Sequence, residues 1–216
     1  GKKTKVPYQT NGCHAKPNDS MTWTNFSAAV SAYQSESGKY DGIGFCLSEG
    51  TPIGVDLDHC RCPAFDSINV EIIAPWAKDI INKIDSYTEA SPSGKGIRIF
   101  AYGGNLPERG RNKKLPQHGG DNCQKGSVPA FEIYQSGRYL TVTGNHIAGT
   151  PTDIMSRPGI IDDVYNQIFG NGFKDDNKPE KLHHASNVSI TNILEKAYRS
   201  NSGDKIKHLY NGDYSA

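Results

Sequence analysis

Two aspartates separated by a single residue offer the clearest chemistry in this sequence. Asp56 and Asp58 end the apolar run Ile53-Gly-Val-Asp-Leu-Asp58, whose composition predicts a strand. Because strand side chains alternate, both carboxylates project from one face, about 6.5–7 Å apart along the backbone. Two like charges on one face repel, and they are costly to desolvate unless a cation lies between them. Oxygen ligands suit Mg²⁺ or Mn²⁺, so the pattern predicts a divalent metal site.

A second segment has the composition of an anion-binding loop. Ser91-Pro-Ser-Gly-Lys-Gly96 precedes an apolar strand at 97–102. Its glycines allow backbone N–H groups to approach a phosphate, while Ser93 and Lys95 add a hydroxyl and a positive charge. Arg98, in the following strand, can point toward the same anion. The loop lacks the full Walker spacing, so a plain turn into a strand is an equally good interpretation.

Three further residues extend this polar set. Glu132 is a third carboxylate in the apolar strand 131–134, and Arg138 opens the next strand, 138–143. These two strands are predicted to form a hairpin, which would bring Arg138 close to Glu132. His146 follows in a segment rich in hydroxyls. Each of the three is also explained as part of a cross-strand pair or as a surface polar group.

The cysteines offer a weaker possibility. The chain has five, an odd and scattered set that indicates reduced thiols in an intracellular protein rather than a disulfide framework. A Cys-x-Cys pair and a His-x₄-Cys pair could form a tetrahedral zinc site, although the spacing is not that of a standard zinc knuckle. The alternative is free thiols, with Cys60 packed as a small hydrophobe. The candidate zinc ligands are Cys60, Cys62, His118 and Cys123.

The elements that must position these residues mix helices and strands. Helical spacing predicts helices near 26–33, from Pro75 to Ile84 and near 160–169. The apolar stretches 43–47 and 53–58 are predicted to form a hairpin around the turn between them. Residues 103–129 are rich in Gly, Pro, Asn and Lys and are typical of an extended loop.

Composition sets the outer limits. A chain of 216 residues suggests one domain with a small appendage. No stretch approaches the ~20 apolar residues of a membrane span, which argues against an integral membrane protein. The 24 basic and 23 acidic residues also argue against a surface coated in positive charge. Any contact with nucleic acid must therefore be local, and the one dense basic run, 109–114, is alternatively a solvated loop.

In their order along the chain, these segments resemble the archaeo-eukaryotic primase superfamily, specifically the phage- and plasmid-encoded primase–polymerases. The family pattern is an apolar strand ending in Asp-x-Asp, a later Ser-x-Gly-x-x-His-type segment and a third acidic residue in a following strand. Here these look like Asp56 and Asp58, the segment from Ser93 to Arg98, and Glu132. The match covers roughly residues 5–165. Arg98 stands where the family usually has histidine.

The resemblance implies a fold and an organisation. The fold would be α/β (α+β), with an RRM-like, mainly antiparallel sheet as the catalytic core over residues 1–169. A polar linker, 170–187, would follow. Residues 188–216 carry an apolar stripe at helical spacing and would begin a helical accessory domain; they could instead dock on the main domain.

The resemblance also implies DNA primase and DNA polymerase activity, that is, template-directed nucleotidyl transfer in the replication of a phage, plasmid or other mobile element. Two Mg²⁺ or Mn²⁺ ions would be held by Asp56, Asp58 and Glu132. The partners would be a single-stranded DNA template, a primer, nucleoside triphosphates and a helicase domain or partner, in the cytoplasm of a host cell. The expected nucleotide-binding residues are Ser93, Lys95, Arg98, Arg138 and His146.

Two other classes of function remain open. A metal-dependent nuclease or nicking replication initiator also gathers carboxylates on such a sheet, but a nicking enzyme usually has a His-x-His metal pair, which this sequence lacks. The second is a non-catalytic nucleic-acid-binding module, in which Arg98 would mark a decayed active site. The presence of all three acidic residues weakens that reading.

Overall fold

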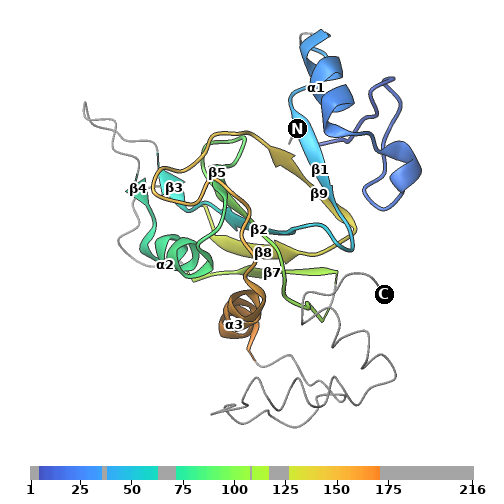
Figure 1. Ribbon diagram of the computed structural model, residues 1–216. Coiled ribbons are helices and arrows are strands. Elements are labelled where there is room, and N and C mark those ends of the chain that lie inside the picture. Colours follow the sequence, from blue (N-terminus) through green and yellow to red (C-terminus); the bar gives the residue numbers. More distant parts are fainter. Residues whose placement is uncertain (1–4, 36–37, 63–71, 108, 117–126, 171–216) are drawn as a thin grey trace, which may run out of the picture. The chain divides into compact units, whose positions relative to one another are not determined.

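A five-stranded antiparallel sheet forms the centre of the computed structural model (Figure 1). The structure describes residues 5–35, 38–62, 72–107, 109–116 and 127–170. All of these residues lie in one unit, Gly1–Phe173. The strands follow one another across the sheet in the order β5 (Thr88–Ala90), β6 (Ile97–Ala101), β2 (Ile53–Asp58), β8 (Ala130–Tyr134) and β7 (Gly110–Lys114).

Two helices cover one face of this sheet. Helix α2 (Pro75–Ile84) and helix α3 (Pro158–Phe169) both have proline in the first turn, where the missing N–H removes no helical hydrogen bond (Figure 1). Their apolar stripes pack on alternate residues of β2, β6 and β8, which are fully buried because period-two alternation sends them all to the same face. The expectation of an α+β fold with a mainly antiparallel sheet is confirmed. The residues of β2, β6 and β8 in this core are Ile53, Val55, Leu57, Ile97, Ile99, Ala101, Phe131 and Ile133.

The two expected hairpins are wrong. Strand β1 (Ile43–Leu47) pairs with β9 (Arg138–Val142) in a separate two-stranded sheet, whereas β2 pairs with β8. The connection at 48–52 therefore links β1 in the two-stranded sheet to β2 in the five-stranded sheet. The connection at 135–137 links β8 in the five-stranded sheet back to β9, the partner of β1. The Gly137 N–H donates to the Leu47 carbonyl oxygen between them. Turn-forming residues mark a change of direction but do not specify whether the flanking strands pair with each other.

The stretch 103–129 is not simply a loop. Its basic portion forms β7, which pairs with β8 at an edge of the sheet. Two very short strands, β3 (Arg61–Cys62) and β4 (Ile72–Ile73), form a third small sheet. The pattern missed β7 because its charged residues have low strand propensity, and pairing with β8 overrides that propensity.

Toward the N-terminus, η1 (Ser20–Thr22) precedes helix α1 (Phe26–Ser35). Helix α1 confirms the expected helix, although none of its residues is buried. The predicted linker at 170–187, apart from Gly170, and the helical stripe at 188–216 lie outside the described residues. Among the described helices, none is both long and apolar enough to cross a membrane.

Candidate active site

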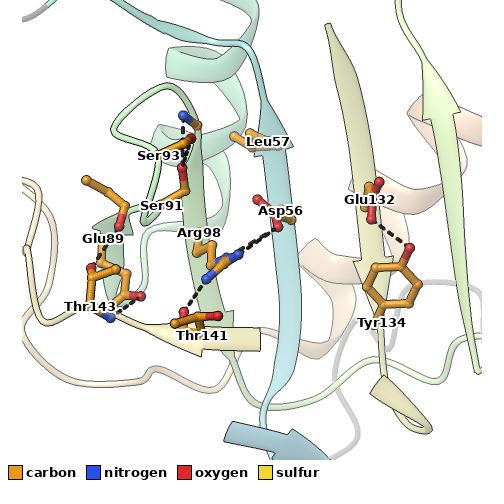
Figure 2. A network of polar contacts seen from close by, with 12 residues as sticks. Asp56, Leu57, Glu89, Ser91, Ser93, Arg98, Glu132, Tyr134, Thr141 and Thr143 are labelled. Atoms are coloured by element: carbon orange, nitrogen blue, oxygen red, sulfur yellow. Dashed lines mark hydrogen bonds and ion pairs between the residues drawn. The ribbon is translucent and has the colours of Figure 1, made fainter. Parts of the chain in front are cut away.

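One row of polar residues crosses the whole sheet. Strand register places Glu89 opposite Arg98, Arg98 opposite Asp56, Asp56 opposite Glu132, and Glu132 opposite Asn112. Directly opposed residues share a face, with Cβ atoms about 4.5–5.5 Å apart. The chain therefore assembles one polar row from five strands, and Figure 2 shows its members Glu89, Arg98, Asp56 and Glu132.

This row lies on the face of the sheet opposite the helices. Val55 and Leu57, which flank Asp56 in β2, are buried in the core with α2 and α3. Alternation sends Asp56 to the other face, and Asp58 follows it there two residues later. The register partner of Asp58 on β8 is Ala130, whose small side chain leaves space beside that carboxylate. The three predicted metal carboxylates thus share one face of two adjacent strands.

Arg98 is held by two elements at once. Its Nε and Nη2 both donate to Oδ2 of Asp56 at 3.3 Å, and its Nη1 donates to the carbonyl oxygen of Thr141 (Figure 2). The residue is only 2% exposed. A buried guanidinium needs such partners because an unpaired charge is costly to desolvate. Its hydrogen-bond partners here are the Asp56 carboxylate on the five-stranded sheet and a carbonyl oxygen of β9 in the two-stranded sheet, rather than the 91–96 loop.

The second oxygen of Asp56 is different. Oδ1 is buried and has no hydrogen-bond partner in the part of the chain that the structure describes. The pKa of Asp56 is raised to about 6, because burial and, to a smaller extent, the nearby carboxylates of Asp58 and Glu132 outweigh the lowering effect of Arg98. An unsatisfied buried oxygen close to two other carboxylates is the environment that a bound cation would relieve.

Glu132 is bonded within its own strand. The Tyr134 hydroxyl donates to Oε2 of Glu132 at 2.7 Å, and the Arg138 guanidinium lies 4.7 Å from the centre of the Tyr134 ring. Burial raises the pKa of Tyr134 to about 12, with Glu132 contributing, so the hydroxyl keeps its proton. Arg138 is therefore connected to Glu132 by way of Tyr134, which contacts both residues, and not by the expected pairing of their strands.

Glu89 is a site residue that sequence reasoning missed. It is fully buried, and its two oxygens accept hydrogen bonds from the backbone N–H groups of Thr143 and Gly144, each at 3.0 Å. The Tyr87 hydroxyl adds a third at 3.1 Å. Glu89 therefore fastens the segment after β9 to the edge of the sheet. The available signal in the sequence was a carboxylate directly before the glycine-rich loop.

The loop at 91–96 is closed by hydrogen bonds of its own. The Ser91 hydroxyl accepts from the Gly96 N–H at 3.1 Å and lies 3.2 Å from the Ser93 hydroxyl, which accepts from the Lys95 N–H at 3.3 Å. A Cβ on Gly96 would lie 2.7 Å from the Leu57 carbonyl oxygen, so only glycine fits this close approach. Ser93 and Lys95 remain exposed.

His146 lies beside the sheet at β5. It forms an isolated bridge with Glu89, and its ring centre is 5.7 Å from that of Tyr87. Its Nε2 lies 3.0 Å from the Thr150 hydroxyl. The structure thus brings Asp56, Glu132 and Arg98 into one row, while the other expected nucleotide ligands lie in separate segments around it.

The cysteines do not form the expected zinc pair. Cys62 is disulfide-bonded, so the expectation of reduced thiols is wrong for this residue, and a disulfide sulfur is not a zinc thiolate ligand. Cys60 is buried, donates to the Leu57 carbonyl oxygen at 3.2 Å, and has its pKa raised by burial to about 12. His118 and Cys123 lie outside the described residues.

The carboxylates of Asp56, Asp58 and Glu132 share a face of the sheet, but their side chains do not point to a common centre in this structure. No group of three Cys, His, Asp or Glu side chains among the described residues is gathered as a metal-binding cluster. Asp56 turns toward Arg98, and Glu132 turns toward Tyr134 (Figure 2). Binding of a metal would therefore require these side chains to rotate toward a common point.

The chain is similar in sequence to a phage enzyme. The chain is 33% identical over 148 residues to a DNA primase-polymerase of Nitratiruptor phage NrS-1. That similarity supports a family relationship with the primase-polymerases. The matched residues make up 68% of this chain and 18% of the phage protein, so the chain spans less than a fifth of its relative. No protein-family model matches the chain.

Proposed function

We propose that this chain is the catalytic core of a DNA primase-polymerase and carries out template-directed nucleotidyl transfer in the replication of a phage or related mobile element. The observation that carries the proposal is the pairing of Asp56 with Glu132 across β2 and β8, with Asp58 on the same face. The similarity to the phage DNA primase-polymerase supports the choice of reaction.

The carboxylates fit a divalent cation in three respects. They present oxygen ligands only, they share one sheet face, and Oδ1 of Asp56 is buried without a donor among the described residues. Two Mg²⁺ or Mn²⁺ ions held by Asp56, Asp58 and Glu132 would neutralise the phosphate charge and activate the primer 3′-hydroxyl. The Tyr134 hydroxyl, protonated because its pKa is raised to about 12, donates only to Oε2 of Glu132, so Oε1 would be the oxygen offered to a metal ion.

The chain's own cations would hold the incoming triphosphate. Ser93 and Lys95 project from the glycine-rich loop, and Arg138 is exposed beside Tyr134. Arg98 is only 2% exposed, but it has N–H donors beyond those used for Asp56 and Thr141, and one of them would bind a phosphate oxygen that enters beside the Asp56 carboxylate. His146, on the segment fastened by Glu89, would contact the nucleotide from the β5 side.

The test is nucleotide incorporation on a primed DNA template, with Mg²⁺ and separately with Mn²⁺, together with dinucleotide synthesis on an unprimed template. The proposal expects incorporation by the wild type and its loss in Asp58→Asn. Strand cleavage without incorporation would favour a nuclease or replication initiator. DNA binding without either reaction would favour the non-catalytic nucleic-acid-binding module.

A further inference from the structure

Strand β7 divides the basic run of the sequence between two faces of the sheet. Arg111 and Lys113 are committed to helix α3: the Lys113 Nζ donates to the Ile168 carbonyl oxygen, and the Arg111 guanidinium lies 4.8 Å from the centre of the Phe169 ring. The Arg111 Nη1 also donates to the Tyr165 hydroxyl at 3.4 Å. These two cations therefore help to attach α3 to the sheet.

The alternate residues of β7 lie on the carboxylate face. Register places Asn112 opposite Glu132, and Lys114 opposite Ala130, which is itself opposite Asp58. Asn112 also hydrogen-bonds the Tyr134 side chain. Asn112 and Lys114 are both exposed. Lys114 thus lies in the same row as Asp58, two strands away, which puts the two backbone positions roughly 9–10 Å apart.

This arrangement answers an electrostatic problem of the site. Asp56, Asp58 and Glu132 repel any polyanion that approaches their face of the sheet. Nucleic-acid affinity comes mainly from cations that replace the counterions of the phosphates. A strand can therefore come near the carboxylates only where cations border them. On β7, the cation on that face is Lys114, at the edge of the sheet.

We propose that the carboxylate face of β7, with Lys114 as its cation and Asn112 as a neighbouring hydrogen-bond donor, binds the phosphodiester backbone of a nucleic-acid strand next to the metal carboxylates. The inference rests on the proposed function for the identity of the substrate. It adds the surface on which that substrate lies. It also separates adjacent lysines by role, because Lys113 serves α3 while Lys114 serves the nucleic acid.

The experiment measures DNA binding without catalysis. A fluorescein-labelled single-stranded oligonucleotide is titrated with the full chain in EDTA, without nucleotide, over a series of salt concentrations. Lys114→Gln is expected to lower the slope of log affinity against log salt by about 0.7, the contribution of one phosphate contact on a single strand. That slope change corresponds to about fivefold weaker binding near 0.1 M salt. Lys114→Arg is expected to retain the wild-type slope.

Lys113→Gln is the matched control, with the same change of charge one residue away on the other face. It is expected to keep the wild-type salt slope and to melt at a lower temperature. Lys83→Gln on α2, which removes a lysine bonded to Gln167, gives a second helix-side control if Lys113→Gln does not fold. An unchanged slope in Lys114→Gln, or an equal loss in a folded helix-side control, would overturn the inference alone. Failure of the wild type to bind DNA would overturn the proposed function as well.

Discussion

Arg98 donates two hydrogen bonds to one oxygen of Asp56, Oδ2, and leaves the other oxygen buried without a partner among the described residues. The guanidinium therefore stabilises only half of this carboxylate. Burial still holds the pKa of Asp56 at about 6 despite the arginine. We infer that the free protein keeps Asp56 incompletely neutralised, which leaves one oxygen available to a metal ion.

Replacing Asp56 and replacing Asp58 should have the same effect on activity and different effects on stability. Either alanine variant should abolish nucleotide incorporation, because each removes a metal ligand. Asp56→Ala should also destabilise the fold by roughly 3 kcal/mol, because it leaves the buried Arg98 guanidinium without its counter-charge. The free energy of unfolding of Asp58→Ala should lie within about 0.5 kcal/mol of the wild-type value. Urea denaturation of both variants checks this, and equal stabilities would contradict the importance of the Asp56–Arg98 pair.

Asp56 should make stability fall as pH rises in the absence of metal. Its pKa is raised from 3.8 to about 6 in the folded protein, so between these values the folded state binds a proton that the unfolded state has released. The free energy of unfolding should lose up to about 1.4 kcal/mol per pH unit from this group between pH 4 and 6. Denaturant unfolding across this range, compared with Asp56→Asn, isolates the effect. A parallel pH profile in the two proteins would contradict it.

Affinity for a divalent metal should rise with pH as Asp56 loses its proton, whereas the stability of the metal-free protein falls over the same range. A divalent cation competes with the proton on Asp56, so Mn²⁺ should bind more tightly as pH rises toward about 6 and reach a plateau above it. Calorimetric titration of the nucleotide-free protein with Mn²⁺ at several pH values measures this. Asp58→Asn, which keeps Asp56 and Arg98, should bind more weakly, and its pH profile should move to lower pH because Asp58 no longer raises the pKa of Asp56. Affinity that does not change between pH 5 and 7 would argue against Asp56 as a ligand.

Glu89→Gln should loosen the segment that carries His146. The glutamine amide would face one of the two backbone N–H groups that now donate to the carboxylate, so a buried donor would lose its partner at about 1–3 kcal/mol. The KM for nucleotide should rise more than kcat falls, because the metal carboxylates stay in place. Tyr87→Phe is the control, since it removes only the hydroxyl and keeps both backbone bonds. Equal kinetics in wild type and Glu89→Gln would show that this clamp is not needed.

Arg98→Ala should weaken binding of a nucleoside triphosphate by about 1.5–3 kcal/mol, the range for a charge-assisted hydrogen bond. Calorimetry measures this directly. Arg98→His should restore part of the loss and introduce a pH dependence near neutrality, because histidine titrates there and arginine does not. Wild-type affinity in Arg98→Ala would assign the phosphate to Lys95 and Arg138 and leave Arg98 as the partner of Asp56 alone.

The sequence by itself determined the features that depend on short-range periodicity. The alternation in 53–58 predicted a strand with Asp56 and Asp58 on one face, and the structure has that strand. Helical spacing predicted a helix from Pro75 to Ile84, and the structure has it as α2, with Ala77 and Ile80 buried. Such patterns are legible because a buried face repeats every 2 residues in a strand and every 3.6 in a helix.

The tertiary structure decided which strands are neighbours. Alternation states which residues of a strand share a face, but it carries no information on which strand lies beside it. The pairing of β2 with both β6 and β8 placed Arg98 and Glu132 on either side of Asp56. Pairing across these sequence distances is set by the burial of the apolar face under α2 and α3, which depends on the whole chain. For the same reason, the strands of the two expected hairpins pair instead as β1–β9 and β2–β8. Glu89 belongs to the polar row only because β5 pairs with β6, which the sequence pattern does not specify.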